Sequence, residues 1–171
     1  CTAVPRCFAA CRYPYLAYAK RCRIARCDAG GFTMGDRAEV ERVVRQAYTA
    51  RERNDLEGFL EVFAERPFFR IAGTRLTSPV TMASSGRDEL RRVLEELIAA
   101  FRWIDHTIVT MLIEGPKAAV FGRVRFRAAS TGDLFETEVA DFIEVKDGRI
   151  VSLTKFCDTA LAAYLMAPAE Q

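Results

Sequence analysis

No apolar run in this 171-residue sequence approaches the roughly 20 residues that a membrane-spanning helix needs. Internal repeats and low-complexity tracts are also missing. Half of the residues are apolar and 28% are charged, a composition that is typical of globular proteins and excludes a disordered or collagen-like chain. We therefore expect a soluble, cytoplasmic protein, and the length fits a single domain.

Metal-binding side chains are scarce over most of the chain. His106 is the only histidine, and five of the six cysteines lie in the first 27 residues. The spacing of these cysteines lacks the paired knuckles and the histidine partners of structural zinc sites. The sequence therefore predicts no metal site and no cofactor.

Positive charge is concentrated at the beginning of the chain. Residues 1–33 carry six Lys or Arg and one acidic residue, a net charge of +5, which leaves −3 for residues 34–171 because the whole chain carries +2. A mildly acidic domain lacks the basic surface that supplies most non-specific affinity for nucleic acid. We expect no nucleic-acid partner.

The first 33 residues differ from the rest in other ways. They begin with Cys and show no amphipathic period, whereas Met34 directly precedes a helix start at Asp36. We interpret residues 1–33 as a basic, Cys-rich extension that is non-native or disordered, and residues 34–171 as the domain. A metal or disulfide function for the first segment is the alternative.

Helices precede strands in the predicted domain. Helical spacing of apolar residues and capping patterns predict three helices, which begin near Asp36, Asn54 and Ser85, and the second is expected to end at Pro67. Residues 73–85 are predicted to be a loop. Apolar and β-branched runs predict these strands: Phe68–Ile71, Ile104–Glu114, Ala118–Ala128, Phe135–Lys146 and Arg149–Cys157. After the third helix only strands are expected, so the fold is α+β, with helices on one face of a curved antiparallel sheet.

Asp141 is out of phase with its predicted strand. Successive strand side chains point to opposite faces, and Asp141 falls on the face that is otherwise apolar. An unpaired carboxylate there would be costly to ionise, so either its pKa rises or a partner compensates its charge. Asp141 is therefore a candidate acid or base, and the alternative is a structural acid bonded to Tyr48 or Thr154.

Pairing of the last strands predicts the neighbours of Asp141. The Asp-Gly pair at residues 147 and 148 is a strong signal for a two-residue hairpin turn, which pairs Asp141 with Thr154 and places Phe156 on the same face. When the apolar face of the strand Ala118–Ala128 is matched to that of the strand that contains Asp141, a short turn between them sets Gly122 opposite Asp141. Because glycine has no side chain, this pairing leaves room beside the carboxylate for a ligand.

Two other residues are candidates for proton transfer. His106 has a suitable unperturbed pKa for a proton shuttle, although a lone histidine is also typical of structural positions. Tyr48 lies on the apolar stripe of the first helix and is either a core anchor or a hydroxyl donor into a pocket. Arg123, Arg125 and Arg127 form a basic row on the outer sheet face, which we interpret as a solvated face or a dimer contact.

Two short motifs carry a resemblance to a known family. Asp-Gly-Arg-Ile at residues 147–150 runs into Phe-Cys-Asp-Thr-Ala-Leu at residues 156–161. With the order of elements, this pattern resembles the SnoaL-like and ketosteroid-isomerase-like branch of the NTF2-like superfamily over residues 36–166. The resemblance implies a cone-shaped fold in which a curved sheet, mixed or antiparallel, is closed by three N-terminal helices. It also implies a small apolar ligand and a homodimer formed through the sheet.

The resemblance also implies chemistry. Asp141 matches the position where ketosteroid isomerases carry the protonated aspartic acid of the oxyanion hole and where SnoaL-type cyclases carry an acid/base aspartate. Tyr48 matches the isomerase tyrosine only with a gap. Ile71 falls on or near the position of the isomerase general base and cannot take a proton, so steroid isomerisation by that route is not expected.

We therefore predict a cofactor-independent isomerase, cyclase or hydrolase that acts on a polyketide-like or terpenoid apolar substrate. The predicted catalytic residues are Asp141, Tyr48 and His106. The predicted ligand-binding residues are Phe63, Trp103, Gly122, Val124, Thr154 and Phe156. A non-catalytic ligand-binding or dimerisation module is the alternative.

Overall fold

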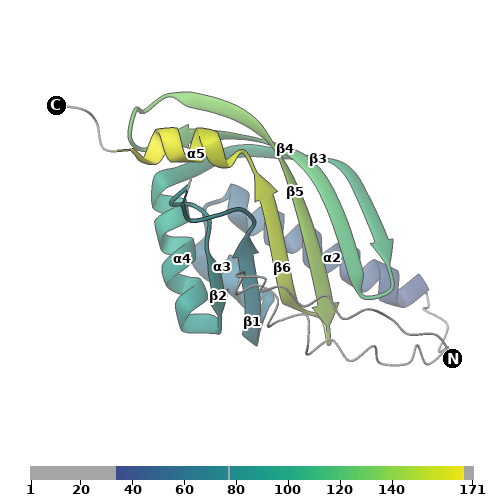
Figure 1. The fold of residues 1–171 in the computed structure, drawn as a ribbon. Coiled ribbons are helices and arrows are strands. Elements are labelled where there is room, and N and C mark those ends of the chain that lie inside the picture. Colours follow the sequence, from purple (N-terminus) through teal and green to yellow (C-terminus); the bar gives the residue numbers. More distant parts are fainter. Residues whose placement is uncertain (1–33, 77, 168–171) are drawn as a thin grey trace, which may run out of the picture. The chain divides into compact units, whose positions relative to one another are not determined.

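The computed structural model describes residues 34–76 and 78–167 of the chain (Figure 1). The prediction for residues 1–33 lies outside the described residues. The helices are α2 (Met34–Glu52), α3 (Leu56–Glu61), α4 (Arg87–Ala100) and α5 (Thr159–Met166). The strands are β1 (Phe63–Ile71), β2 (Ala83–Ser85), β3 (Phe101–Glu114), β4 (Lys117–Ala128), β5 (Leu134–Lys146) and β6 (Arg149–Cys157).

The strands form one mixed sheet in the order β2-β1-β6-β5-β4-β3. Neighbouring strands are antiparallel except β1 and β6, which run parallel. The sheet is curved and does not close on itself, and α2 lies along one of its faces (Figure 1). These observations confirm the predicted α+β class and the curved mixed sheet.

The core lies between the helices and this face of the sheet. Val43 and Val44 of α2, and Leu90 and Leu94 of α4, are almost completely buried and belong to one cluster with the inward-facing residues of the strands. Removal of this apolar surface from water is the main stabilising contribution in such a domain. None of the described helices is both long enough and apolar enough to cross a membrane.

The elements differ from the prediction at several points, both in their boundaries and in two elements that were not predicted. Helix α3 ends at Glu61, and β1 begins at Phe63 instead of Phe68. Pro67 is accommodated in β1 because the β1–β6 ladder is irregular between Phe63 and Phe68, and proline has no backbone N–H to contribute. The short strand β2 lies inside the predicted loop, and α5 follows the last strand, where no helix was predicted. The side chain of Asp158 caps α5 by accepting hydrogen bonds from two backbone N–H groups of its first turn.

The β5–β6 hairpin sets the register around Asp141. Its Asp-Gly turn has positive φ at both residues, 51° and 69°, as predicted for a two-residue hairpin. Val151 is then an extra residue in β6, a β-bulge that shifts the ladder by one position. As a result Asp141 pairs with Lys155, and the predicted pairing with Thr154 is wrong.

The β4–β5 pairing also differs from the prediction, by two residues. Gly122 pairs with Val139, and Asp141 pairs with Val120. The connection between these strands is longer than the short turn that the sequence predicted. Because the shift is an even number of residues, every side chain of β4 and β5 stays on its predicted face.

Candidate active site around Asp141

Asp141 is a buried carboxylate with two donors on one oxygen. The residue is only 1% exposed and lies on the face of β5 that points toward the helices. Its Oδ2 accepts hydrogen bonds from the Tyr48 hydroxyl at 2.6 Å and from Lys155 Nζ at 2.8 Å. Its Oδ1 has no hydrogen-bond partner among the described residues. Of the two expected outcomes for a buried acid, compensation by a charged partner is the one observed.

Lys155 is a residue of the candidate site that sequence reasoning missed. Its side chain is 17% exposed and forms the ion pair with Asp141. The bulge at Val151 turns Lys155, instead of Thr154, toward the helices. A signal was present in the sequence, since the apolar residues Ile150 and Leu153 are three positions apart, whereas strict alternation needs an even spacing.

Tyr48 lies on α2 with its ring in the core, where it is 7% exposed. Burial raises the pKa of its hydroxyl well above the ordinary value, and the nearby Asp141 carboxylate raises it further. The phenol therefore keeps its proton and acts as a hydrogen-bond donor to Asp141. Both alternatives for Tyr48 apply, because it anchors the core and donates into the site.

The imidazole of His106 is buried between two aromatic rings. Its side chain is 1% exposed and stacks on Tyr48 at 4.3 Å and on Trp103 at 5.2 Å between ring centroids. Burial, and after it the positive charge of Lys155, lowers the pKa of His106 to about 4. The ring is therefore neutral at neutral pH, and its Nε2 has no hydrogen-bond partner in the described part of the chain.

Gly122 makes room for His106. A β-carbon at this position would lie 2.5 Å from His106 Nε2 and 2.9 Å from the backbone oxygen of Thr107. The space that the sequence analysis assigned to a ligand is therefore occupied by the imidazole. This result corrects the predicted reason for the glycine, although Gly122 stays next to the site.

Two small apolar cavities adjoin the Asp141 cluster. The inner cavity, about 40 Å³, is lined by residues that include Asp141 and Tyr48, and the outer cavity, about 90 Å³, by residues that include Val124. Four side chains line both cavities: Arg51, Leu97, Trp103 and Lys155. A buried acid beside apolar space is an arrangement that suits proton transfer on an apolar molecule.

A comparison with known protein families identifies the family of this chain. Residues 44–153 match the model of the SnoaL-like domain family. The chain belongs to the SnoaL-like domain family. No curated protein matches it.

Solved structures with the same fold extend the comparison. This SnoaL-like chain is 24% identical to an NTF2-like protein from Burkholderia thailandensis, with 75% of this chain and 98% of that chain covered and a TM-score of 0.62. A Kribbella flavida protein, provisionally named a ketosteroid isomerase, is 21% identical, with 78% of this chain and 84% of that chain covered and a TM-score of 0.56. A Jannaschia protein, provisionally named a SnoaL-like polyketide cyclase, is 12% identical, with 77% of this chain and 94% of that chain covered and a TM-score of 0.62. At these identities the likeness shows the NTF2-like fold.

Four predicted ligand-binding residues of the SnoaL-like domain do not line either cavity, and Gly122, described above, is one of them. Phe63 is completely buried but packs edge-on against Phe59, with 5.3 Å between ring centroids, outside both cavities. Thr154 and Phe156 lie on the opposite face of the sheet because of the bulge, and Phe156 is 45% exposed. Trp103 and Val124 line the outer cavity.

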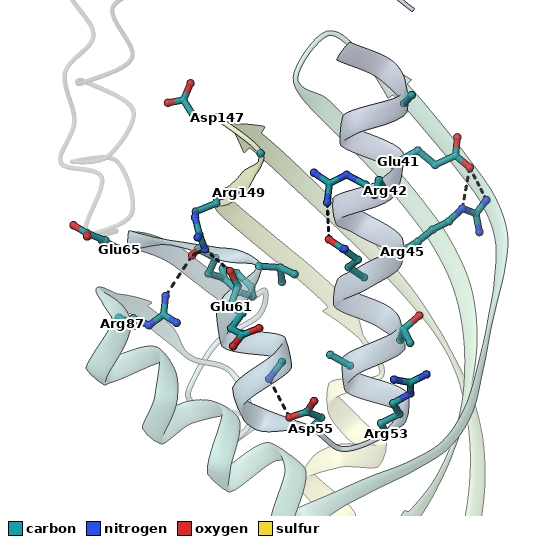
Figure 2. A pocket seen from close by; sticks show the side chains of 18 residues that line it. Glu41, Arg42, Arg45, Arg53, Asp55, Glu61, Glu65, Arg87, Asp147 and Arg149 are labelled. Atoms are coloured by element: carbon teal, nitrogen blue, oxygen red, sulfur yellow. Dashed lines mark hydrogen bonds and ion pairs between the residues drawn. The ribbon is translucent and has the colours of Figure 1, made fainter. Parts of the chain in front are cut away.

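A much larger hollow of the SnoaL-like domain lies elsewhere. Figure 2 shows this groove, about 1320 Å³, along α2 and α3, and it shares no lining residue with the two cavities at Asp141. Arginines and acidic residues line it in equal number, and several bond to one another, for example Arg45 with Glu41. None of the titratable side chains that line this groove is buried, whereas Asp141 is, so the small cavities at Asp141 are the candidate site despite their size.

Proposed function

We propose that this SnoaL-like protein is a cofactor-independent enzyme of the isomerase or cyclase type, in which Asp141 is the general base for an apolar, polyketide-like or terpenoid substrate. One observation carries the proposal. Asp141 is buried, its Oδ2 is held by two donors, and its Oδ1 is free of any partner in the described residues.

The pairing with Lys155 favours a base over an acid. In the isomerases that the sequence resembles, the matching aspartic acid is protonated and donates a hydrogen bond. Here an ammonium group 2.8 Å from Oδ2 compensates the negative charge of the carboxylate, and the Tyr48 hydroxyl supplies a second donor. A carboxylate that is paired and oriented in this way can accept a proton through its other oxygen.

The proposed step is removal of a proton from a carbon next to a carbonyl group. The C–H bond breaks, the proton moves to Oδ1 of Asp141, and the electron pair moves onto the carbonyl oxygen as an enolate. The ammonium of Lys155 carries three N–H donors, of which the structure shows one in use among the described residues, so it can stabilise that oxygen. Return of the proton to a different carbon completes an isomerisation. In a cyclisation the enolate carbon attacks a second carbonyl group of the substrate, whose C=O electron pair moves onto oxygen, and the resulting alkoxide takes the proton back from Asp141.

His106 has a supporting role in this proposal. Its ring is neutral and stacks between Tyr48 and Trp103, so it holds the ring of Tyr48 in the orientation that donates to Asp141. Among the described residues, His106 donates no hydrogen bond to Asp141. We therefore place the proton transfer on Asp141 and the positioning on Tyr48 and His106.

The test is hydrogen exchange at carbon. A panel of apolar ketones and lactones is incubated with the protein in deuterated buffer, and loss of the α-proton signal is followed by NMR. Asp141→Asn should slow exchange by about 10²–10⁴-fold, the usual contribution of a positioned base. Asp133→Asn, at an exposed turn, is the matched control and should leave the rate unchanged. Equal rates for the Asp141 variant and the wild type would contradict the proposal.

The alternative is a ligand-binding module without chemistry, because the same fold hosts both kinds of protein. The apolar lining of the two cavities supports binding in either case. The two functions differ in the exchange experiment. A binding module takes up ketones without exchanging their protons, and its Asp141→Asn variant keeps the ligand affinity.

We also propose that the protein forms a homodimer through the outer face of the sheet. Leu112, Phe121, Phe142 and Phe156 expose 66%, 36%, 58% and 45% of their surface there. They lie on adjacent strands in two cross-strand rows, since Ala119 pairs with Leu112 and Phe142, and Ala140 with Phe121 and Phe156. An apolar patch of this kind marks an interaction site.

The dimer is tested by light scattering after size exclusion. Phe142→Glu introduces a charge at the centre of the patch and should convert the dimer to a monomer. Leu76→Glu, at a loop residue that is 95% exposed, is the matched control and should leave the mass unchanged. A wild-type protein of monomer mass would contradict this proposal.

A further inference from the structure

Arg51 is a buried cation beside the candidate site. The residue is 7% exposed and lines both cavities. Burial lowers the pKa of its guanidinium to about 9, so the group stays charged at neutral pH. A charge in this position is costly unless something compensates it.

The protein compensates Arg51 only with neutral acceptors. Its guanidinium donates to the Asn54 side-chain oxygen at 2.8 Å and to the backbone oxygens of Phe101 and Leu97 at 2.6 and 3.4 Å. Within the described part of the chain, no carboxylate lies close enough to form an ion pair with it. The positive charge therefore remains without a counter-ion, although most of its hydrogen-bond donors are used.

The other buried charges cancel. Lys155 and Asp141 form an ion pair at 2.8 Å. Asp158 also lines the outer cavity, but it is exposed and its carboxylate caps α5, so water screens it. The buried part of the site thus carries one excess positive charge, that of Arg51.

Both cations lie on the same aromatic ring. The Arg51 Cζ is 4.7 Å and the Lys155 Nζ is 5.6 Å from the centroid of the Trp103 ring. A ligand that enters the cavities next to Trp103 is therefore within reach of a guanidinium and an ammonium group. These two groups bind carboxylates through short, charge-assisted hydrogen bonds.

We propose that the site binds a small cyclic carboxylate, with the anionic group directed to Arg51 and Lys155 and the ring against the apolar wall. This inference rests on the proposed use of the cavities as the substrate site and names the class of substrate. The wall of the outer cavity includes Val124, Phe126 and Leu161. The two cavities, about 90 and 40 Å³, are each smaller than the cavity of about 150 Å³ that accommodates benzene, so a single ring is the upper limit of ligand size at this site.

The test compares two ligands that differ only in charge. Cyclohexanecarboxylate and cyclohexanecarboxamide are titrated into the full chain at neutral pH by calorimetry. Trp103 is the only tryptophan in the chain, so its fluorescence shows that the ligand enters these cavities. We expect the carboxylate to bind about tenfold more tightly or better, the factor that one charge-assisted hydrogen bond supplies. Equal or weaker binding of the carboxylate, or no binding of either compound at millimolar concentration, would overturn the inference.

Two variants assign the preference to charge. Asp141→Asn keeps the shape of the site and releases Lys155 from its counter-ion, so it should tighten carboxylate binding and leave carboxamide binding unchanged. The double variant Asp141→Asn/Lys155→Met removes the ion pair and leaves Arg51, so a preference for the carboxylate should persist. Asp133→Asn is the control and should behave as wild type. Loss of the preference in the double variant would overturn the role of Arg51.

The result is separate from the test of catalysis. Binding of the carboxylate with no proton exchange at carbon keeps this inference and contradicts the proposed enzyme. Proton exchange on neutral ketones with no preference for carboxylates would support the proposed enzyme and contradict this inference.

Discussion

Gly122 on β4 lies directly against the imidazole of His106 on β3. A β-carbon at Gly122 would be 2.5 Å from His106 Nε2, closer than side-chain atoms can approach without a shift. The same imidazole stacks on Tyr48, whose hydroxyl donates to Asp141. The absence of a side chain at residue 122 therefore positions the donor that holds the candidate base.

Gly122→Ala should disturb this arrangement. The added methyl group forces the ring away from β4, and overpacking of this kind costs about 1–3 kcal/mol in the free energy of unfolding. Thermal or chemical denaturation measures the loss. His106→Ala in the same chain removes the ring, so the double variant should lose less than the sum of the two single variants. Additive losses would show that the contact between residue 122 and His106 does not cause the loss of stability in Gly122→Ala.

Tyr48→Phe removes one donor from Asp141 and leaves the ring in place. A buried acceptor that loses a hydrogen bond costs about 1–3 kcal/mol, so the variant should be less stable by this amount. Tyr164→Phe is the matched control, because Tyr164 is 72% exposed and its change should stay within about 0.5 kcal/mol. Urea denaturation of both variants provides the comparison, and similar losses in the two would contradict the role of the Tyr48 hydroxyl.

Lys155→Met leaves the Asp141 carboxylate buried without a counter-ion. Removal of one partner of a buried ion pair costs about 3–5 kcal/mol, and the partial exposure of Lys155 places the expected loss at the lower end. The double variant Lys155→Met/Asp141→Asn should recover most of this loss, because no unpaired charge remains. Lys117→Met, at an exposed position of β4, is the control. Denaturation midpoints of the four proteins test the prediction, and a double variant as unstable as the single one would refute it.

His106 makes stability depend on pH. Its pKa is lowered to about 4 in the folded protein, whereas an unfolded chain has a value near 6.5. Between these values the unfolded state binds the proton and the folded state does not, so stability falls as the pH decreases from about 6.5 to 4. The loss from this residue between pH 7 and pH 4.5 should be about 2 kcal/mol.

The pH effect can be separated from that of other groups. Burial raises the pKa of Glu52, so this carboxylate acts in the opposite direction as the pH falls. His106→Gln retains Glu52 and removes the histidine, which is the only one in the chain. Urea denaturation at both pH values should therefore show a smaller loss in the variant than in the wild type. An equal loss in both proteins would assign the effect to other residues.

Much of the fold was predictable because local sequence patterns determine it. The helical spacing of Val40, Val43, Val44 and Ala47 predicts the buried face of α2, and the Asp-Gly pair predicts the β5–β6 turn. Alternation along β5 placed Asp141 on the buried face without any knowledge of its partners. The sequence by itself thus determined the α+β order, the hairpin and the burial of the carboxylate.

Only the tertiary structure decided which groups surround Asp141. One extra residue, Val151, turns Lys155 toward the carboxylate and Thr154 and Phe156 away from it, because a shift of one residue reverses the faces of a strand. The position of Arg51 beside Trp103 likewise depends on the packing of α2 against β3. Burial follows from a local period in the sequence, whereas the partners of a buried charge depend on the register and packing of elements far apart in the chain.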